Sequence, residues 1–189
     1  MINRRLRKVD VGSCSYFDGN AHQVRYFLNA VYIGLGARIV MITNETRRFW
    51  GFRSISYLAS LFLMIFERKL HRMHLKLNDE HIRGRIMTVC IGSAKGYGLT
   101  PSAVPYNGWL DVSVIYRPEL LQLVSGLWML QHNRLLNHKT VKSYRTRKVQ
   151  LLRAQNSEVS LDGRLLLDKH YPLEVRISVS YTHLRAHET

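Results

Sequence analysis

Apolar and polar residues alternate along most of this chain, which is the pattern expected of half-buried β-strands. The alternation is clearest near the C-terminal end, where Leu173, Val175 and Ile177 are separated by polar residues. Turn-forming pairs such as Asp-Gly interrupt the strand patterns. The segments predicted as strands are 8–17, 23–33, 73–77, 85–92, 109–116, 140–154, 158–167 around a turn at Asp162-Gly163, and 171–178.

Three segments have a helical pattern instead, at 37–46, 52–70 and 118–132. We expect about seven strands and three helices, with strand pairs adjacent in the sequence and helices inserted between them. This order favours a mainly β fold with inserted helices (α+β), an antiparallel sandwich or barrel, over a doubly wound parallel sheet. The helix over 52–70 is expected to pack on the sheet.

The composition supports one well-packed domain with an anionic partner. Hydrophobic residues make up 46% of the 189 residues, and 28 Lys and Arg oppose 13 Asp and Glu, a formal net charge of +15. Nucleic acid, anionic lipid headgroups and phosphorylated substrates all fit this charge, as does a solvated basic surface. The most apolar stretch, residues 54–66, is too short to cross a bilayer.

Several familiar chemistries are excluded by the absence of their motifs. The sequence contains no GxxxxGK[ST] phosphate loop, no HExxH and no GxSxG. His71 and His74 lie at helical spacing without a third ligand nearby, so surface histidines describe them better than a zinc site. Cys14 and Cys90 match no metal or disulfide pattern and are expected to be reduced and buried.

An ordered set of short motifs carries the functional prediction. In sequence order they are Val9-Asp10-Val11-Gly12, Tyr26-Phe27-Leu28-Asn29, Ile33-Gly34-Leu35-Gly36-Ala37, Lys95-Gly96-Tyr97-Gly98, Pro101-Ser102-Ala103, Asn107-Gly108-Trp109-Leu110-Asp111-Val112 and Leu161-Asp162-Gly163. Each alone is a common turn or loop pattern. Together, over roughly residues 8–178, they resemble the C-terminal half of the bacterial diacylglycerol kinase and sphingosine kinase superfamily.

The resemblance implies a domain that works beside a second one. In that family an N-terminal α/β domain carries a GGDGT nucleotide loop, which this sequence lacks, and the C-terminal β-sandwich supplies the lipid pocket. ATP and Mg²⁺ are the implied cofactors and a lipid such as diacylglycerol is the implied substrate. Asp162 is then the candidate catalytic carboxylate that orients or deprotonates the lipid hydroxyl.

The candidate site departs from the family pattern at two positions that matter for nucleotide and metal. The family's DGE is Asp162-Gly163-Arg164 here, so Gly163 and Arg164 fall where the resemblance puts the nucleotide, with a cation in place of a carboxylate. Asn107 takes the place of an aspartate that resembles a magnesium ligand. Its carbonyl oxygen can still ligate the ion, but without the charge.

Other interpretations of the same residues remain open. Asp162 with Gly163 is also a strong hairpin-turn signal, and the apolar residues of 52–70 could be core rather than a lipid pocket. The basic cluster Lys142, Arg145, Arg147 and Lys148 could contact an anionic membrane or only solvent. A catalytically inert lipid-binding domain is one alternative, and a nucleic-acid-binding β-domain is another, although no RNP-like or OB-like aromatic spacing supports it.

The expected organisation is therefore a lipid-side kinase domain over residues 1–179. Residues 180–189 fall outside the pattern and are expected to be a non-native tail. We expect the isolated chain to be inactive without the nucleotide-binding domain, and the parent enzyme to be cytoplasmic and peripheral to the membrane.

Overall fold

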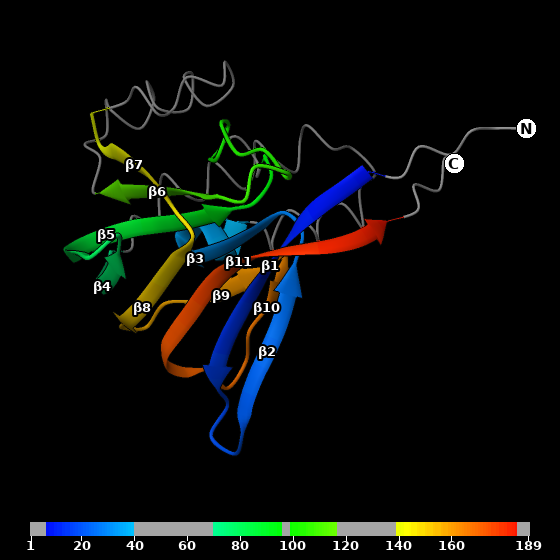
Figure 1. Ribbon diagram of the computed structural model, residues 1–189. Coiled ribbons are helices and arrows are strands. Elements are labelled where there is room, and N and C mark those ends of the chain that lie inside the picture. Colours follow the sequence, from blue (N-terminus) through cyan, green and yellow to red (C-terminus); the bar gives the residue numbers. More distant parts are fainter. Residues whose placement is uncertain (1–6, 40–69, 96–98, 117–138, 185–189) are drawn as a thin grey trace, which may run out of the picture.

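The computed structural model describes residues 7–39, 70–95, 99–116 and 139–184, and these form one curled, antiparallel β-sheet (Figure 1). The main path of the sheet runs β10-β9-β3-β5-β4-β8-β11-β1-β2, and β6 and β7 branch from β5. The strands are β1 (Arg7–Phe17), β2 (His22–Phe27), β3 (Ala30–Gly34), β4 (His71–Leu77), β5 (Glu80–Gly92), β6 (Leu110–Tyr116), β7 (Val141–Thr146), β8 (Lys148–Ala154), β9 (Val159–Leu161), β10 (Arg164–Leu165) and β11 (His170–Leu184).

The mainly β, antiparallel fold predicted from the sequence is confirmed, but two predicted strands are each divided. The segment 23–33 forms β2 and β3, because β2 pairs with β1 whereas β3 pairs with β5 and β9. The segment 140–154 forms β7 and β8, which separate at Arg147 because β7 pairs with β6 whereas β8 pairs with β4 and β11. A strand that changes partners must break its ladder, and alternation in the sequence does not record that break.

The predicted helices can be compared with the structure only in part. Residues 35–39 are helical, at the start of the helix expected over 37–46. The helices expected over 52–70 and 118–132 lie outside the described residues, apart from Leu70, which immediately precedes β4. Among the described residues, no helix is long and apolar enough to span a membrane.

The long strand β5 connects the two parts of the sheet. Ile86 pairs with His71 of β4 and with Tyr116 of β6, so these two strands lie on opposite edges of β5. Beyond this point the edge used by β4 is taken over by β3, which pairs with Gly92 through Thr88. This exchange of partners lets the sheet fold over on itself while β5 stays paired along most of its length.

One hydrophobic core fills the space between the two ends of the folded sheet. Ile33 of β3 and Leu161 of β9, near one end, belong to the same buried cluster as Cys14 of β1 and Phe27 of β2 at the other end. This packing of one end of the sheet against the other gives the sandwich-like form predicted from the sequence. Both cysteines are buried and free, as expected, and burial raises the pKa of each thiol to about 12.

Gly12 of β1 is required by this core because the ring of Phe27 occupies the space next to it. A Cβ atom at position 12 would lie 2.1 Å from Cζ of Phe27, whose side chain is only 1% exposed. The two residues are also directly paired across β1 and β2. The glycine of the Asp10-Val11-Gly12 motif therefore has a packing reason.

We predict that Gly12→Ala destabilises the chain by about 1–3 kcal/mol, since the extra methyl group overpacks the core against Phe27. Gly84→Ala is the matched control, because a Cβ atom at Gly84 of β5 meets nothing within 4 Å. Urea unfolding of both variants measures the difference. Equal stability of the two variants would show that the core yields freely around Phe27.

Candidate functional site

Asp162 and Gly163 form the tight turn between β9 and β10. Both have positive φ angles, 46° and 85°, as a two-residue type I′ hairpin turn requires. Arg164 begins β10 and pairs with Leu161 across the turn, and its side chain is exposed. The hairpin interpretation of the Asp-Gly pair is therefore confirmed as the local structure.

The carboxylate of Asp162 also holds the connection between β2 and β3. Its Oδ1 accepts hydrogen bonds from the backbone N–H groups of Asn29 at 2.9 Å and Ala30 at 3.0 Å, and its Oδ2 accepts one from Leu28 at 2.7 Å. The backbone N–H of Asp162 donates in turn to the carbonyl of Ala30 at 3.0 Å. These residues lie more than 130 positions away in the sequence, so the turn is fixed by tertiary contacts.

The start of the glycine-rich segment joins the same place. The backbone N–H groups of Ser93 and Ala94 donate to the carbonyl of Asn29 at 2.9 and 3.2 Å, and Ser93 Oγ donates to the carbonyl of Leu28 at 2.8 Å. We call the meeting of Leu28–Ala30, Ser93–Lys95 and Asp162–Arg164 the three-loop junction. It brings together three motifs that the sequence analysis could place only in order along the chain.

Asp162 is well placed to present a fixed carboxylate at this junction. Three backbone donors hold its two oxygens, and the residue is nevertheless exposed. A carboxylate accepts about four hydrogen bonds, so the three backbone donors leave it capacity for a further partner. The arrangement can orient a hydroxyl group or accept its proton, and the catalytic role of Asp162 stays a prediction.

Asn107 lies in a different loop, which is fastened to β1. Its Oδ1 accepts a hydrogen bond from the N–H of Trp109 at 2.9 Å. The buried carboxylate of Asp10 accepts one from the N–H of Gly108 at 2.7 Å, and the N–H of Asp10 donates to the carbonyl of Pro105 at 2.7 Å. Asp10 was only a motif position in the sequence analysis, and the structure shows that it anchors this loop.

The loop around Asn107 does not by itself offer a complete set of magnesium ligands. The oxygens of Asn107 and Asp10 already accept backbone hydrogen bonds, and the Asp111 carboxylate of β6 forms an ion pair with Arg145 at 2.8 Å. Within the described ranges, no group of three or more His, Cys, Asp or Glu residues could hold a metal ion. Magnesium at Asn107 stays a prediction that needs ligands from elsewhere.

Each member of the basic cluster noted in the sequence has a different neighbour. Lys142 lies over the ring of Tyr116 with Nζ 5.7 Å from the ring centroid, while Arg145 pairs with Asp111. The guanidinium of Arg147 lies 4.7 Å from the centroid of the Trp109 ring, and Lys148 Nζ is 2.7 Å from the Glu174 carboxylate. The side of the strand on which a residue lies, and the strand next to it, decide where each of these charged side chains points; closeness in the sequence does not.

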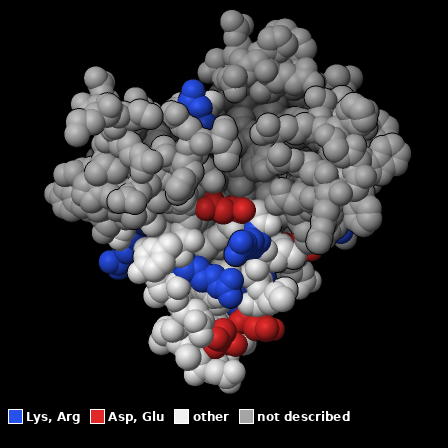
Figure 2. Space-filling view, turned by 90° about the vertical axis from the view of Figure 1, so that its right-hand side faces the viewer, with Lys and Arg blue, Asp and Glu red and all other residues white. Residues whose placement is uncertain are grey.

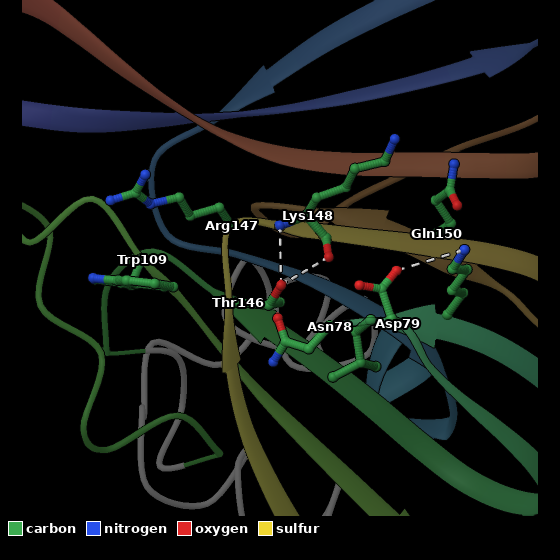
Figure 3. A pocket seen from close by; sticks show the side chains of 9 residues that line it. Asn78, Asp79, Trp109, Thr146, Arg147, Lys148 and Gln150 are labelled. Carbon is green, nitrogen blue, oxygen red and sulfur yellow. Dashed lines mark hydrogen bonds and ion pairs between the residues drawn. The ribbon is translucent and has the colours of Figure 1, made fainter.

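An open pocket lies beside the stacked Arg147 and Trp109 (Figure 3). Its volume is about 390 Å³. The residues that line it are Lys76, Leu77, Asn78, Asp79, Trp109, Thr146, Arg147, Lys148 and Gln150. Asp162, Gly163, Arg164 and Asn107 do not line this pocket, so the three-loop junction remains the candidate site.

Charges of both signs share the face of the molecule seen in Figure 2. There Lys and Arg side chains gather at the centre of the described surface, with acidic side chains above and below them. The net charge of +15 is therefore not spread over this face as an uninterrupted positive field.

Residues 29–181 match the family described as the YegS C-terminal NAD kinase beta sandwich-like domain. The chain belongs to this family. The matched region runs from Asn29 in the junction to the last strand, β11, and includes all of the Asp162–Arg164 turn.

The curated relatives have lipid kinase names. The chain is 28% identical over 169 residues to a "Probable lipid kinase YegS-like" from Pseudomonas savastanoi pv. phaseolicola, and 27% identical to a protein of the same name from Pseudomonas syringae pv. syringae. Each alignment covers 86% of this chain and 53% of the relative. The chain therefore spans about half the length of the curated relatives it matches.

Solved structures share the fold at low sequence identity. A diacylglycerol kinase structure from Bacillus anthracis aligns with a TM-score of 0.53 and 13% identity, covering 92% of this chain and 51% of that one. A yeast NADH kinase in complex with NADH aligns with a TM-score of 0.52 and 11% identity, covering 91% of this chain and 40% of that one. At these identities the likeness establishes the fold.

We predict that Asp162→Asn lowers the stability of the chain. The amide oxygen can still accept from Asn29 and Ala30, but the amide NH₂ then meets the N–H of Leu28, so two donors face each other. Loss of a hydrogen bond to a charged group costs about 1.5–3 kcal/mol, and urea unfolding measures it.

Asp168→Asn is the matched control for this prediction. Asp168 is also exposed and also has a positive φ, 51°, so the substitution is the same in chemistry and in backbone conformation. We expect a change within about 0.5 kcal/mol at this position. Equal effects of the two substitutions would show that the junction does not depend on the Asp162 carboxylate.

Proposed function

We propose that this chain is the lipid-side domain of an ATP-dependent lipid kinase that phosphorylates a hydroxyl of a diacylglycerol-like lipid. The observation that carries the proposal is the match of residues 29–181 to the YegS C-terminal family, whose curated relatives are named as lipid kinases. Because the chain spans about half of those relatives, the proposal includes a partner domain that binds the nucleotide.

The proposed role of Asp162 follows from the chemistry of phosphoryl transfer. Such reactions depend mainly on positioning and charge stabilisation, with a carboxylate that orients the attacking hydroxyl or accepts its proton. Three backbone donors fix the Asp162 carboxylate at the junction of β2, β3, β9 and β10. Strands on both sides of the turn keep the group in place, which is what a positioning catalyst needs.

Gly163 and Arg164 are proposed to face the nucleotide. A glycine in the turn allows close approach of the backbone, and a guanidinium can bind phosphate oxygens through two N–H groups at once. With Arg164 exposed, its side chain is free to extend from the sheet end towards a nucleotide. We propose that ATP is the phosphoryl donor, bound with Mg²⁺, and that Asn107 contributes an oxygen towards the ion if the nucleotide supplies further ligands.

We propose that the enzyme acts at the cytoplasmic surface of a membrane, where a diacylglycerol-like substrate resides. The net charge of +15 supports attraction to anionic lipids. The enzyme would then reach its lipid from the bilayer surface as a peripheral protein.

A chimera tests the proposed function directly. Residues 1–189 are joined to the part of the Pseudomonas savastanoi relative that the chain does not cover, and ATP-dependent phosphorylation is measured on diacylglycerol and other lipid alcohols in neutral detergent micelles. We expect turnover by the chimera and none by residues 1–189 alone. A folded chimera that phosphorylates no lipid while the intact relative does would overturn the proposal.

The same chimera tests the catalytic role of Asp162. We predict that Asp162→Asn lowers kcat roughly 100-fold or more, because it removes the carboxylate that accepts the proton. Val149→Ala serves as the control, since it removes a buried core side chain of β8 and lowers stability without altering the junction. If both variants keep most of their kcat at a temperature where both are folded, Asp162 is a structural turn residue and not a catalytic one.

A further inference from the structure

Four adjacent strands, β11, β8, β4 and β5, present an unusually basic outer face. Their alternate residues, such as Leu75, Leu151 and Val175, point into the core, so the residues between them lie on the outside of the sheet. Eleven of the outer residues, where the four strands lie side by side, are Arg72, His74, Lys76, His81, Arg83, Arg85, Lys148, Gln150, Arg153, Glu174 and Arg176. We call this set the cationic face: it contains seven Lys or Arg residues and one carboxylate.

The strand register places basic side chains directly opposite one another. Between β4 and β5, Arg72 is paired with Arg85, and His74 is paired with Arg83. On the other side of β4, His74 is paired with Arg153 of β8. Like charges at directly opposite positions destabilise a sheet, so folding alone gives no reason for this arrangement.

The single carboxylate of the face is already committed to its own end of the sheet. Glu174 accepts from Lys148 at 2.7 Å, from Gln150 at 2.9 Å and from Arg176. Burial raises the pKa of Glu174, but these donors outweigh that effect and lower it to about 2. Glu174 therefore stays charged and balances the β11 and β8 end of the face, while at the β4 and β5 end only Lys76 has a carboxylate nearby among the described residues, that of Asp79 at 3.8 Å.

At the β4 and β5 end the arginines lack acidic neighbours. Among the residues that the structure describes, no carboxylate lies within ion-pair distance of Arg72, Arg83, Arg85 or Arg153. Arg83 Nε instead donates to the ring of His74 at 3.1 Å. Burial, Arg83 and His81 lower the pKa of His74, as expected in a positive field.

We propose that the cationic face is the surface by which this protein docks onto an anionic lipid bilayer. The inference rests on the proposed lipid kinase function, which it deepens by naming the docking surface. Negative headgroups would relieve the repulsion between facing cations and supply the missing counter-charge. Basic residues near an anionic membrane each contribute about 1 kcal/mol of attraction.

One feature favours a bilayer over nucleic acid as the partner. The face continues across Ser13 and Ser15 of β1 to Val24 and Tyr26 of β2, which are paired with those serines and are 53% and 70% exposed. Exposed apolar side chains beside cations suit the boundary between headgroups and acyl chains.

Vesicle sedimentation with residues 1–189 tests the proposal. The face variant is Arg72→Gln/Arg83→Gln/Arg85→Gln, and the matched control is Arg25→Gln/Lys139→Gln/Lys142→Gln, which removes the same charge from exposed positions outside the face. Vesicles of phosphatidylcholine containing 30% phosphatidylglycerol, with pure phosphatidylcholine as the neutral arm, are compared at low and at physiological salt. Melting temperatures confirm that both variants fold.

We expect binding to the anionic vesicles only, with affinity falling roughly 100-fold in the face variant and much less in the control. The face variant should melt at the same or a higher temperature than the unchanged chain, since three repelling charges are gone. Equal losses in both variants, or no binding to anionic vesicles at low salt, would overturn the proposal.

Two further outcomes separate this inference from its alternatives. Tighter binding of single-stranded RNA than of anionic vesicles, lost in the face variant, would overturn the proposal in favour of a nucleic-acid surface. Turnover of the chimera on diacylglycerol in neutral detergent does not require docking, so that assay reports the lipid kinase function alone. If the chimera is active in micelles but residues 1–189 do not bind anionic vesicles, the docking surface is rejected and the proposed function stands.

Discussion

The connection between β2 and β3 sets the constraint on which the candidate site depends. The chain leaves one end of the sheet at Phe27 and enters β3, near the other end, at Ala30. Backbone groups that leave a ladder need new partners, because an unpaired N–H is costly where water is excluded. The carboxylate of Asp162 supplies three acceptor contacts at this crossing, so one residue completes the hydrogen bonding of a segment 132 to 134 positions away.

This constraint explains why a structural and a catalytic role for Asp162 are compatible. The backbone donors that use part of the carboxylate also fix its position, and the residue remains exposed beside the start of the glycine-rich segment at Ser93. A group held by main-chain donors needs little reorganisation when it meets a substrate. The family relationship places this junction in a domain whose curated relatives are named as lipid kinases.

On the outer side of the same sheet, the arrangement of charged residues is not explained by stability. The inner residues of β4, β5 and β8 form a dense core, whereas the outer residues set arginine opposite arginine and histidine. Local choices that oppose stability are commonly found where a protein has a function to perform. Glu174 shows that the sheet can balance such charges, since it accepts from three neighbours at once.

The sequence by itself determined most of the strand segments and the antiparallel fold class, because alternation and turn pairs such as Asp162-Gly163 are local signals. The ordered set of short motifs indicated the family through its resemblance. The sequence did not determine that 23–33 and 140–154 each form two strands, since a change of pairing partner leaves the alternation intact. Only the tertiary structure showed that Asp162 binds the backbone of Leu28–Ala30 and that Asn107 belongs to a separate loop held by Asp10. Likewise, the register across β4, β5, β8 and β11 places cations up to 104 positions apart in the sequence on one face of the sheet. Residues close in the sequence, such as Arg145 and Lys148, instead pair with different carboxylates. Hydrogen-bond partners and charge neighbours are set by which strands pair, and that choice depends on the packing of the whole core.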